Sequence, residues 1–194
     1  MIDVDLDQVS IPLRWAELFD REAPTDVEIG SGKGKFLNEF ATANPERNIL
    51  AIERSAKYHR LGCDRAARRG LTNLRLLHTT GEDLLFRLLD EASVANFYVL
   101  FPDPWPKKRH HKRRFFKTEI VAALSRALMA GGRLLVKSDH DGYAEVIGRV
   151  LAEAPDLRQI DPEGAFANLP ITGFEHKYAI EGRQIFQFAY TRGI

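Results

Sequence analysis

The sequence predicts an α/β fold with a mainly parallel central sheet and helices on both faces. Apolar, β-prone runs alternate along most of the chain with segments whose apolar residues recur at helical spacing. Such alternation builds right-handed βαβ units. The run from Phe97 to Phe101 is continuously apolar, which suits a strand buried on both faces of a parallel sheet. The length of 194 residues fits one domain.

The first strand and helix follow the acidic N-terminal segment. Asp26 to Ile29 is a short β-prone run that ends in glycines. Apolar residues then recur at helical spacing from Phe36 to Ala41, and Asn44-Pro45 ends this helix. Asn48 to Glu53 is the second strand.

The middle of the chain continues the alternation. Ala56 to Arg69 is a basic amphipathic helix that stops at Gly70, a residue type favoured after helix ends. Leu74 to His78 is the third strand and Leu84 to Leu89 a short helix. Asn96 to Phe101 is a strongly apolar fourth strand, and a proline-rich, basic loop follows it.

The pattern weakens toward the C-terminus. Thr118 to Leu128 is a helix that ends at two glycines, Arg133 to Ser138 is the fifth strand, and Tyr143 to Ala154 is the fifth helix. After Pro155 we predict only a last strand over Gln184 to Tyr190.

The net charge of +1 is unevenly distributed. Pro102 to Lys117 contains seven Lys/Arg and one acid, a net of +6, so the rest of the chain sums to −5. Cys63 is the only cysteine, which excludes an intrachain disulfide and a multi-Cys zinc site. No apolar stretch approaches the roughly 20 residues of a membrane span, and the acidic N-terminus differs from a signal peptide. We therefore expect a cytoplasmic enzyme.

Polar residues gather at one predicted edge of the sheet. In parallel α/β sheets, ligands bind outside the carboxyl ends of the strands. At those ends lie the turn Gly30 to Gly34, Glu53, Thr80 to Asp83, Pro102 to Trp105, and Ser138-Asp139. This edge is the candidate site.

The glycine turn differs from the dinucleotide fingerprint G-x-G-x-x-G, which would need its third glycine where Lys35 stands. Glu28 precedes the turn, and an acid there would repel a phosphate and favour a cation such as the amino group of a methionine-like moiety. The glycines are Gly30, Gly32 and Gly34. The pattern E-x-G-x-G-x-G resembles the S-adenosylmethionine site of class I methyltransferases. Glu53 is placed to accept hydrogen bonds from both ribose hydroxyls.

The loop after the fourth strand combines a carboxylate with a cationic segment. Three prolines restrict the chain from Phe101 to Pro106, so we expect a stiff loop that holds Asp103 beside the methyl group. Trp105 can stack on a base or support the loop. The run Lys107 to Arg114 begins in the predicted site, which favours contacts with phosphates over a role in solubility alone.

From about residue 26 onward the chain resembles the tRNA (guanine-N7)-methyltransferase family. The irregular segment Phe101 to Arg114 carries the resemblance most specifically, with Val27 to Gly34, Lys137 to Asp139, and Thr172 to Glu175. The resemblance implies a Rossmann-like class I methyltransferase fold with an antiparallel last strand. It implies S-adenosylmethionine as the cofactor and a guanosine in the variable loop of tRNA as the substrate. We divide the chain into an N-terminal segment (1–25), a cofactor-binding core (26–154) and a C-terminal substrate-binding portion (155–194).

Motif matches imply roles for individual residues. Cofactor binding is implied for Glu28, Gly30, Gly32, Gly34, Glu53, Thr80 and Asp103, with Asp103 as the catalytic residue. Substrate binding is implied for Lys107, Arg109, His110, Lys112, Arg113, Arg114, Asp139, Thr172 and Glu175.

The chain departs from the family pattern at four places, one of which is Ser138 where members commonly have Thr. Thr80 stands where members commonly carry an Asp that contacts the adenosine, and Glu82 or Asp83 is the candidate substitute. Gly173 replaces a common Lys. Residues 1–28 contain eight acids and two arginines where many members have a basic arm.

Guanine N7 carries a lone pair and no proton, so methyl transfer to it needs placement more than a general base. Asp103 can stabilise the positive charge that develops on the base. No metal is needed, and the spacing of His, Cys and acidic residues predicts no metal cluster. We expect tRNA as the partner and a monomer or homodimer.

Two alternatives stay open. The D-P-x-W stretch also suits a methyltransferase acting on an exocyclic amine of a nucleobase. Thr80 and Gly173 would fit a non-catalytic RNA-binding protein on a methyltransferase fold.

Overall fold

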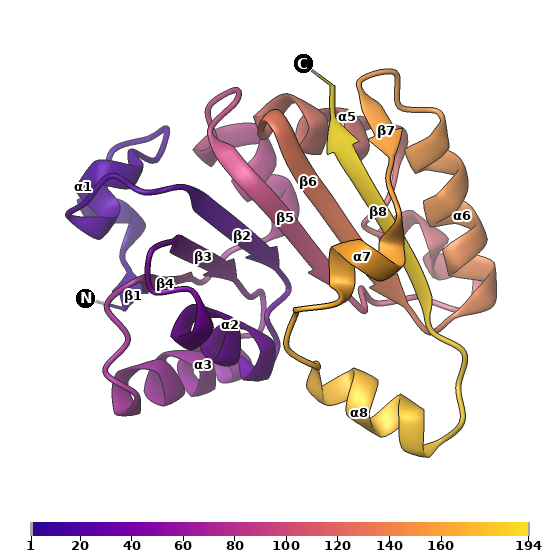
Figure 1. Ribbon diagram of the computed structural model, residues 1–194, viewed down its shortest axis with the longest axis horizontal. Coiled ribbons are helices and arrows are strands. Elements are labelled where there is room, and N and C mark those ends of the chain that lie inside the picture. The colour runs from indigo at the N-terminus through magenta and orange to yellow at the C-terminus, as the bar shows by residue number, and fades with distance from the viewer. Residues whose placement is uncertain (1, 194) are drawn as a thin grey trace.

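The computed structural model describes residues 2–193 and contains one eight-stranded sheet (Figure 1). The strand order is β1-β4-β3-β2-β5-β6-β8-β7. The strands are β1 (Asp3–Val4), β2 (Thr25–Ile29), β3 (Asn48–Ile52), β4 (Leu74–Leu77), β5 (Val94–Leu100), β6 (Leu128–Ser138), β7 (Leu157–Gln159) and β8 (Phe186–Arg192).

The sheet is parallel from β1 to β6, and β8 pairs antiparallel with β6 and with β7. This confirms the predicted mainly parallel sheet with an antiparallel last strand. The order reverses direction at β2, where β3 lies on one side and β5 on the other. A crevice at such a switch point is where α/β sheets bind ligands.

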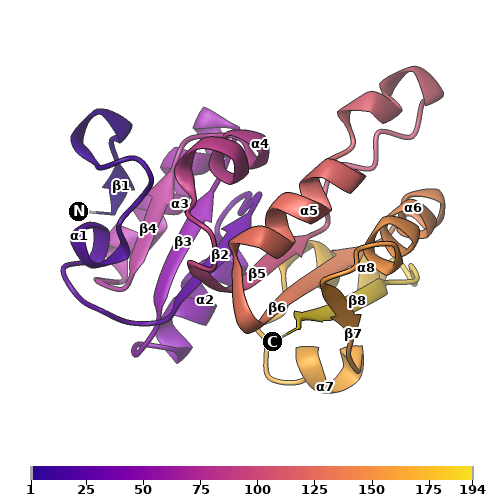
Figure 2. The ribbon, with the colours of Figure 1, turned by 90° about the horizontal axis from the view of Figure 1, so that it is seen from above.

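Helices cover both faces of the sheet. Apolar side chains of α1 (Trp15–Phe19), α5 (Thr118–Ala127) and α6 (Asp141–Ala152) share one core with the π-helical turn η2 (Leu84–Leu88). Those of α2 (Lys35–Ala43), α3 (Ala56–Arg68) and α7 (Pro162–Phe166) share the core on the other face. Figure 2 shows α6 and α7 on opposite sides of β8.

The remaining elements are short. They are η1 (Leu6–Gln8), α4 (Gly81–Asp83), the 3₁₀ segment η3 (Lys108–Arg113) and α8 (Gly173–Ile180). We predicted none of β1, α1, β7, α7 and α8 from the sequence. β1, α1, β7 and α7 have five residues or fewer, which is too short for a recognisable apolar periodicity in the sequence. α8 is longer but buries no side chain, so its sequence shows no apolar face.

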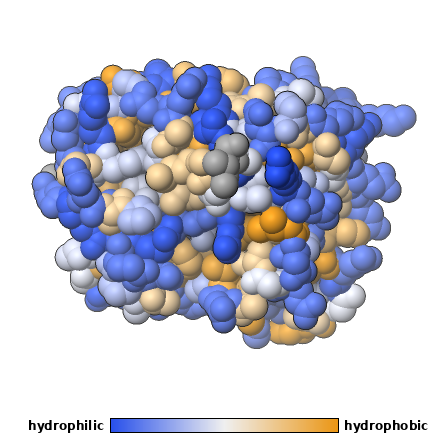
Figure 3. All heavy atoms as spheres, turned by 45° about the horizontal axis from the view of Figure 1, so that its top comes forward, coloured by the Kyte–Doolittle hydropathy of each residue, from blue (hydrophilic) through white to orange (hydrophobic). Residues whose placement is uncertain are grey.

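The face drawn in Figure 3 is mostly hydrophilic, with apolar side chains in small scattered groups. Among residues 2–193, no helix is both long enough and apolar enough to cross a bilayer.

Candidate active site

A cleft of about 330 Å³ opens at the carboxyl ends of the parallel strands. Its walls come from the turn after β2, the ends of β3 and β5, and the start of α4. Of the residues predicted for the cofactor, the cleft is lined by Gly30, Gly32, Glu53, Thr80 and Asp103. The fold therefore brings together residues that are up to 73 positions apart in the sequence.

The turn after β2 requires glycine for two reasons. Gly30, Gly32 and Gly34 have φ of 84°, 54° and 73°, in the left-handed region that other residues avoid. A Cβ added at Gly30 or Gly32 would meet no atom within 4 Å, so the backbone there is open to the cleft. A Cβ at Gly34 would lie 3.3 Å from Cα of Gly62, where α2 begins beside α3.

Glu53 fixes the turn from the end of β3. Its Oε2 accepts a hydrogen bond from the backbone N–H of Gly32 at 2.8 Å, and its Oε1 accepts one from the N–H of Ser55 at 2.7 Å. Each oxygen keeps a second lone pair for a ligand hydroxyl. The carboxylate is thus oriented before any cofactor binds.

Glu28 lies behind the glycine turn rather than on the cleft wall. The residue is buried, and its Oε2 has no hydrogen-bond partner within the described part of the chain. Burial, and secondarily the charge of Glu53, raises the pKa of this carboxyl to about 8. A buried acceptor without a partner is costly, so a cationic ligand group that reached it would be strongly favoured.

Thr80 and Glu82 both line the cleft, whereas the Asp83 side chain lies outside it and bonds to other side chains of the protein. Thr80 caps α4 by accepting from the N–H of Asp83. The Asp83 carboxylate is paired with Arg87 at 2.7 Å and accepts from the Thr79 hydroxyl. Of the two candidate substitutes for the missing Asp, Glu82 is the one whose position suits a cofactor contact.

Asp103 stands in an exposed loop at the cleft mouth. The loop departs from β5 through Phe101 and Trp105, whose φ values of 60° and 44° are left-handed. The Arg113 guanidinium stacks over the Trp105 ring at 4.9 Å, which holds that conformation. Thus Trp105 supports the loop in this structure. Asp103 Oδ2 lies 3.6 Å from Nη2 of Arg54, across the cleft from the end of β3.

The basic segment, Lys107 to Arg114, leaves the cleft and leads to α5. Figure 2 shows the chain just before α5 extending away from the body of the molecule. The side chains of Lys107, Arg109, Lys112 and Arg113 are exposed, and His110 is half-buried.

Arg114 differs from the rest of this segment because it is only 6% exposed. Its Nε donates to the Pro104 carbonyl at 2.8 Å, and its guanidinium lies over the Tyr143 ring at 4.8 Å. We predicted an RNA contact for Arg114 from the sequence, whereas in the structure its side chain holds the Asp103 loop against α6.

Thr172 and Glu175 form a capping box at the start of α8. The Thr172 hydroxyl accepts from the Glu175 N–H at 2.9 Å, and the Glu175 carboxylate accepts from the Thr172 N–H. Both residues are therefore engaged within the protein. Asp139, at the end of β6, is paired with Arg183 at 3.1 Å.

Arg54 and Lys137, for which no role was predicted, also belong to this region, together with Phe174 of the segment Thr172 to Glu175, for which the family resemblance implies substrate binding. Phe174, 52% exposed, faces the cleft and packs near Phe101 and Tyr178, with ring centroids 6.1 and 5.9 Å away. Arg54 supplies a cation at the mouth, and Lys137 anchors α8 through Glu175. Arg54 could have been predicted from the sequence, because it directly follows Glu53 at the end of a strand that reaches the site.

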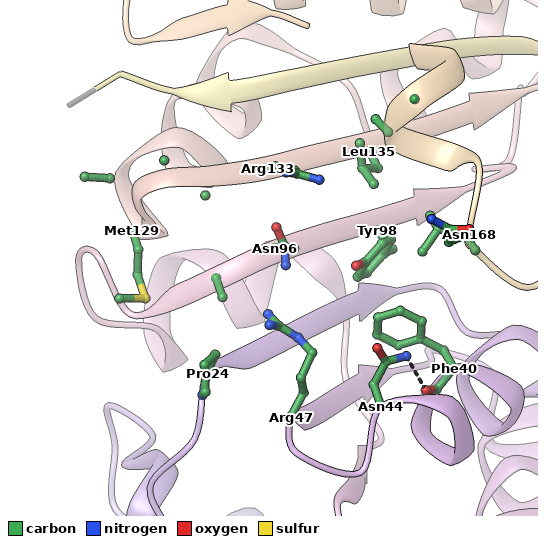
Figure 4. A pocket seen from close by; sticks show the side chains of 17 residues that line it. Pro24, Phe40, Asn44, Arg47, Asn96, Tyr98, Met129, Arg133, Leu135 and Asn168 are labelled. Carbon is green, nitrogen blue, oxygen red and sulfur yellow. Dashed lines mark hydrogen bonds between the residues drawn. The ribbon is translucent and has the colours of Figure 1, made fainter. Parts of the chain in front are cut away.

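A larger cavity of about 590 Å³ lies elsewhere, at the amino ends of β2, β3, β5 and β6 (Figure 4). Beside it, the Asp26 carboxylate forms an ion pair with Arg47 and accepts a hydrogen bond from the Asn96 amide. None of the predicted site residues lines this cavity. Its place at the amino ends of the strands is opposite to where α/β sheets bind ligands.

Comparisons with known proteins agree with this geometry. A family model described as "Putative methyltransferase" matches residues 22–188. A tRNA (guanine-N(7)-)-methyltransferase of Nitrosococcus oceani is 37% identical over 185 residues, which cover 94% of this chain and 78% of the relative. A protein of the same name from Mycobacterium avium is 37% identical over 195 aligned positions, covering 97% and 74%.

Solved structures show the same fold. A 16S rRNA methyltransferase, KamB, superposes with a TM-score of 0.63 at 19% identity over 93% of each chain. A SAM-dependent methyltransferase from Aquifex aeolicus superposes with a TM-score of 0.61 at 14% identity, over 91% of this chain and 92% of the other.

Proposed function

The chain belongs to the tRNA (guanine-N7)-methyltransferase family, and on that premise we propose that it transfers a methyl group from S-adenosylmethionine to N7 of a guanosine in tRNA. The observation that carries the proposal is the cleft, in which the glycine turn and Glu53 meet Asp103. The basic segment begins at the rim of this cleft, where Arg113 lines it.

The residues present fit the cofactor. Gly30 and Gly32 leave the backbone open to the cleft, and Glu53 is oriented with free lone pairs. Glu28 has a buried oxygen that finds no partner among residues 2–193. We assign the cofactor to these residues, Gly34, Thr80 and Asp103, within residues 26–154. When bound, S-adenosylmethionine supplies a methyl group on a sulfonium, which a nitrogen lone pair accepts without a general base.

Asp103 is the proposed catalytic residue. Its carboxylate reaches the cleft mouth on a loop held by the Arg113–Trp105 stack and by buried Arg114. A carboxylate there binds the donor edge of guanine and stabilises the positive charge that N7 methylation creates. A fixed charge of this kind lowers the barrier because it needs little reorganisation.

We assign tRNA phosphates to the exposed side chains of Lys107, Arg109, Lys112 and Arg113 and to the half-buried His110 between them. Residues 155–194 complete the substrate side. In this proposal Thr172 and Glu175 act by fixing the start of α8, which presents Phe174 to the cleft, and Asp139 steadies the far end of α8 through Arg183.

The test is incubation of the protein with methyl-labelled S-adenosylmethionine and unmodified tRNA, followed by nucleoside analysis. We expect 7-methylguanosine, confirmed by chain cleavage after borohydride and aniline treatment. Label on an exocyclic amine would instead identify the enzyme as a methyltransferase that acts on exocyclic amines of nucleobases. Absence of both label and cofactor binding would favour a non-catalytic RNA-binding protein.

A further inference from the structure

A second group of reactive side chains lies outside the cleft, between β1 and α3. Asp3, His59 and Cys63 each place one potential ligand atom there, and the three atoms lie within 4.8 Å of one another. Although the sequence spacing predicted no metal cluster, folding brings Asp3 to residues more than 50 positions away. The chain therefore contains a carboxylate, an imidazole and a thiol at one point, the donor types that Zn²⁺ prefers.

The backbone fixes this arrangement. β1 pairs in parallel with β4, so that Asp3 stands opposite Leu76. Gly62 lets α3 pack closely on β4, since a Cβ there would lie 2.7 Å from Cδ2 of Leu76. His59 and Cys63 are four residues apart on α3 and therefore share the face that looks toward β1.

Two of these groups converge on a single ring nitrogen. Asp3 Oδ1 lies 3.2 Å from His59 Nε2, and Cys63 Sγ lies 3.7 Å from the same atom. One N–H can point at only one of them, whereas a cation between the three satisfies all their lone pairs. With Zn–N and Zn–O bonds of about 2.0–2.1 Å and Zn–S of about 2.3 Å, tetrahedral ligands stand roughly 3.3–3.6 Å apart. The two separations at His59 Nε2, 3.2 and 3.7 Å, are close to these values, and the third pair of ligand atoms lies within 4.8 Å.

We propose that Asp3, His59 and Cys63 form a binding site for Zn²⁺ or a similar borderline-soft divalent cation. His59 is buried at 4% exposure, while the Asp3 side chain is 61% exposed, so the site opens to solvent on one side. Three protein ligands with one position left to water is an established zinc geometry.

The bound cation ties the edge strand to the cofactor half of the protein. β1 has two residues and lies at the edge of the sheet. α3 begins after Ser55, whose N–H binds Glu53. Zn²⁺ therefore stabilises the N-terminal segment against α3 and takes no part in methyl transfer.

The test is a Co²⁺ titration of the metal-free full chain, followed by displacement with Zn²⁺. We expect one Co²⁺ per chain, with the near-ultraviolet charge-transfer band of a thiolate ligand. Cys63→Ser removes the band, and both Cys63→Ser and His59→Gln weaken Zn²⁺ binding by at least about 10–100-fold, the loss caused by removing even an outer-shell partner. Hydrogen exchange in β1 slows on addition of Zn²⁺.

The matched control is His110→Asn with His111→Asn, because adjacent histidines can bind a metal adventitiously and these two lie in the basic segment, outside the proposed site. This double variant keeps the band and the affinity. Cys63→Ser is a small change at a half-buried residue, so it tests the site even where His59→Gln fails to fold. A wild-type chain that shows no thiolate band, or an affinity that only the His110/His111 variant lowers, overturns the proposal.

Discussion

The ammonium nitrogen of Lys137 lies 2.6 Å from Oε1 of Glu175 and thereby joins β6 to α8 through a buried ion pair. The Lys137 ammonium also stands 4.6 Å from the Phe166 ring of α7. Because the other oxygen of Glu175 closes the capping box with Thr172, one carboxylate fixes both the position and the start of α8. This places Phe174 at the cleft.

Glu175→Gln should therefore destabilise the protein by about 2–4 kcal/mol, because it leaves the Lys137 charge buried without a counter-charge. Lys137→Met with Glu175→Gln should recover part of that loss. Chemical denaturation of the single and double variants measures the coupling. Strictly additive losses would show that the two side chains do not act as a pair.

Glu28 should make stability and cofactor affinity depend on pH in opposite directions. Its folded-state pKa of about 8 lies above the unfolded value, so the folded chain holds a proton that the unfolded chain has released between about pH 4.5 and 8. The stability contributed by this group is complete below pH 4.5 and is lost as pH rises through 8. Cofactor affinity rises over the same range, since the ionised carboxylate is the form that accepts from a cation.

Glu28→Gln should abolish both trends. We expect it to be about 2 kcal/mol more stable than the parent chain near pH 8, with weaker cofactor binding and a flat pH profile. Thermal unfolding and calorimetric titration across pH 6–8.5, with exposed Glu145→Gln as the control, provide the measurement. If Glu28→Gln kept the parent's pH slope, another group would be responsible.

Asp103→Ala should remove most methyl transfer, by about 100-fold or more, because a preorganised charge at the developing cation is lost. Cofactor binding should survive at least in part, since Glu28, the glycine turn and Glu53 are untouched. Single-turnover rates and equilibrium binding separate the two effects.

Arg54→Gln is the informative companion to Asp103→Ala. Both side chains of the Arg54–Asp103 ion pair are exposed to solvent, so the pair contributes little to the stability of the fold. If Asp103 served only to pair with Arg54, this variant would lower the rate as much as Asp103→Ala. Exposed Asp90→Ala, outside the cleft, should leave the rate unchanged.

Sequence reasoning located most of the site because alternating strands and helices determine which residues reach the carboxyl edge of the sheet. It could not tell which member of a basic run is buried. Arg114 is buried because its guanidinium binds the Pro104 carbonyl and packs on the ring of Tyr143, which lies 29 positions away in the sequence. Nor could it show that Glu175 meets Lys137, because α8 lacks an apolar face. Tertiary contacts between distant residues decide such cases.

Charge reversal of Lys108, Arg109 and Lys112 to Glu tests the basic segment, and it leaves Arg113 intact because the stack of Arg113 on Trp105 holds the Asp103 loop. The three reversed side chains are exposed, and none forms an ion pair within residues 2–193, so reversal should spare the fold. We expect tRNA affinity to fall by more than about tenfold and the slope of log K against log salt to shrink by about 2–3, as each lost phosphate contact removes roughly 0.7–0.9. Filter binding at several salt concentrations measures both quantities.

Reversal of Arg68, Arg69 and Arg158 changes the net charge equally at exposed positions away from the cleft. If binding depended on total charge, the two triple variants would lose tRNA affinity to the same extent. The compact +6 segment on a body of −5 argues for a local effect, because screening confines each charge to within about 8–10 Å at physiological salt. The control should therefore retain most of its affinity, and both variants should bind S-adenosylmethionine as the parent chain does.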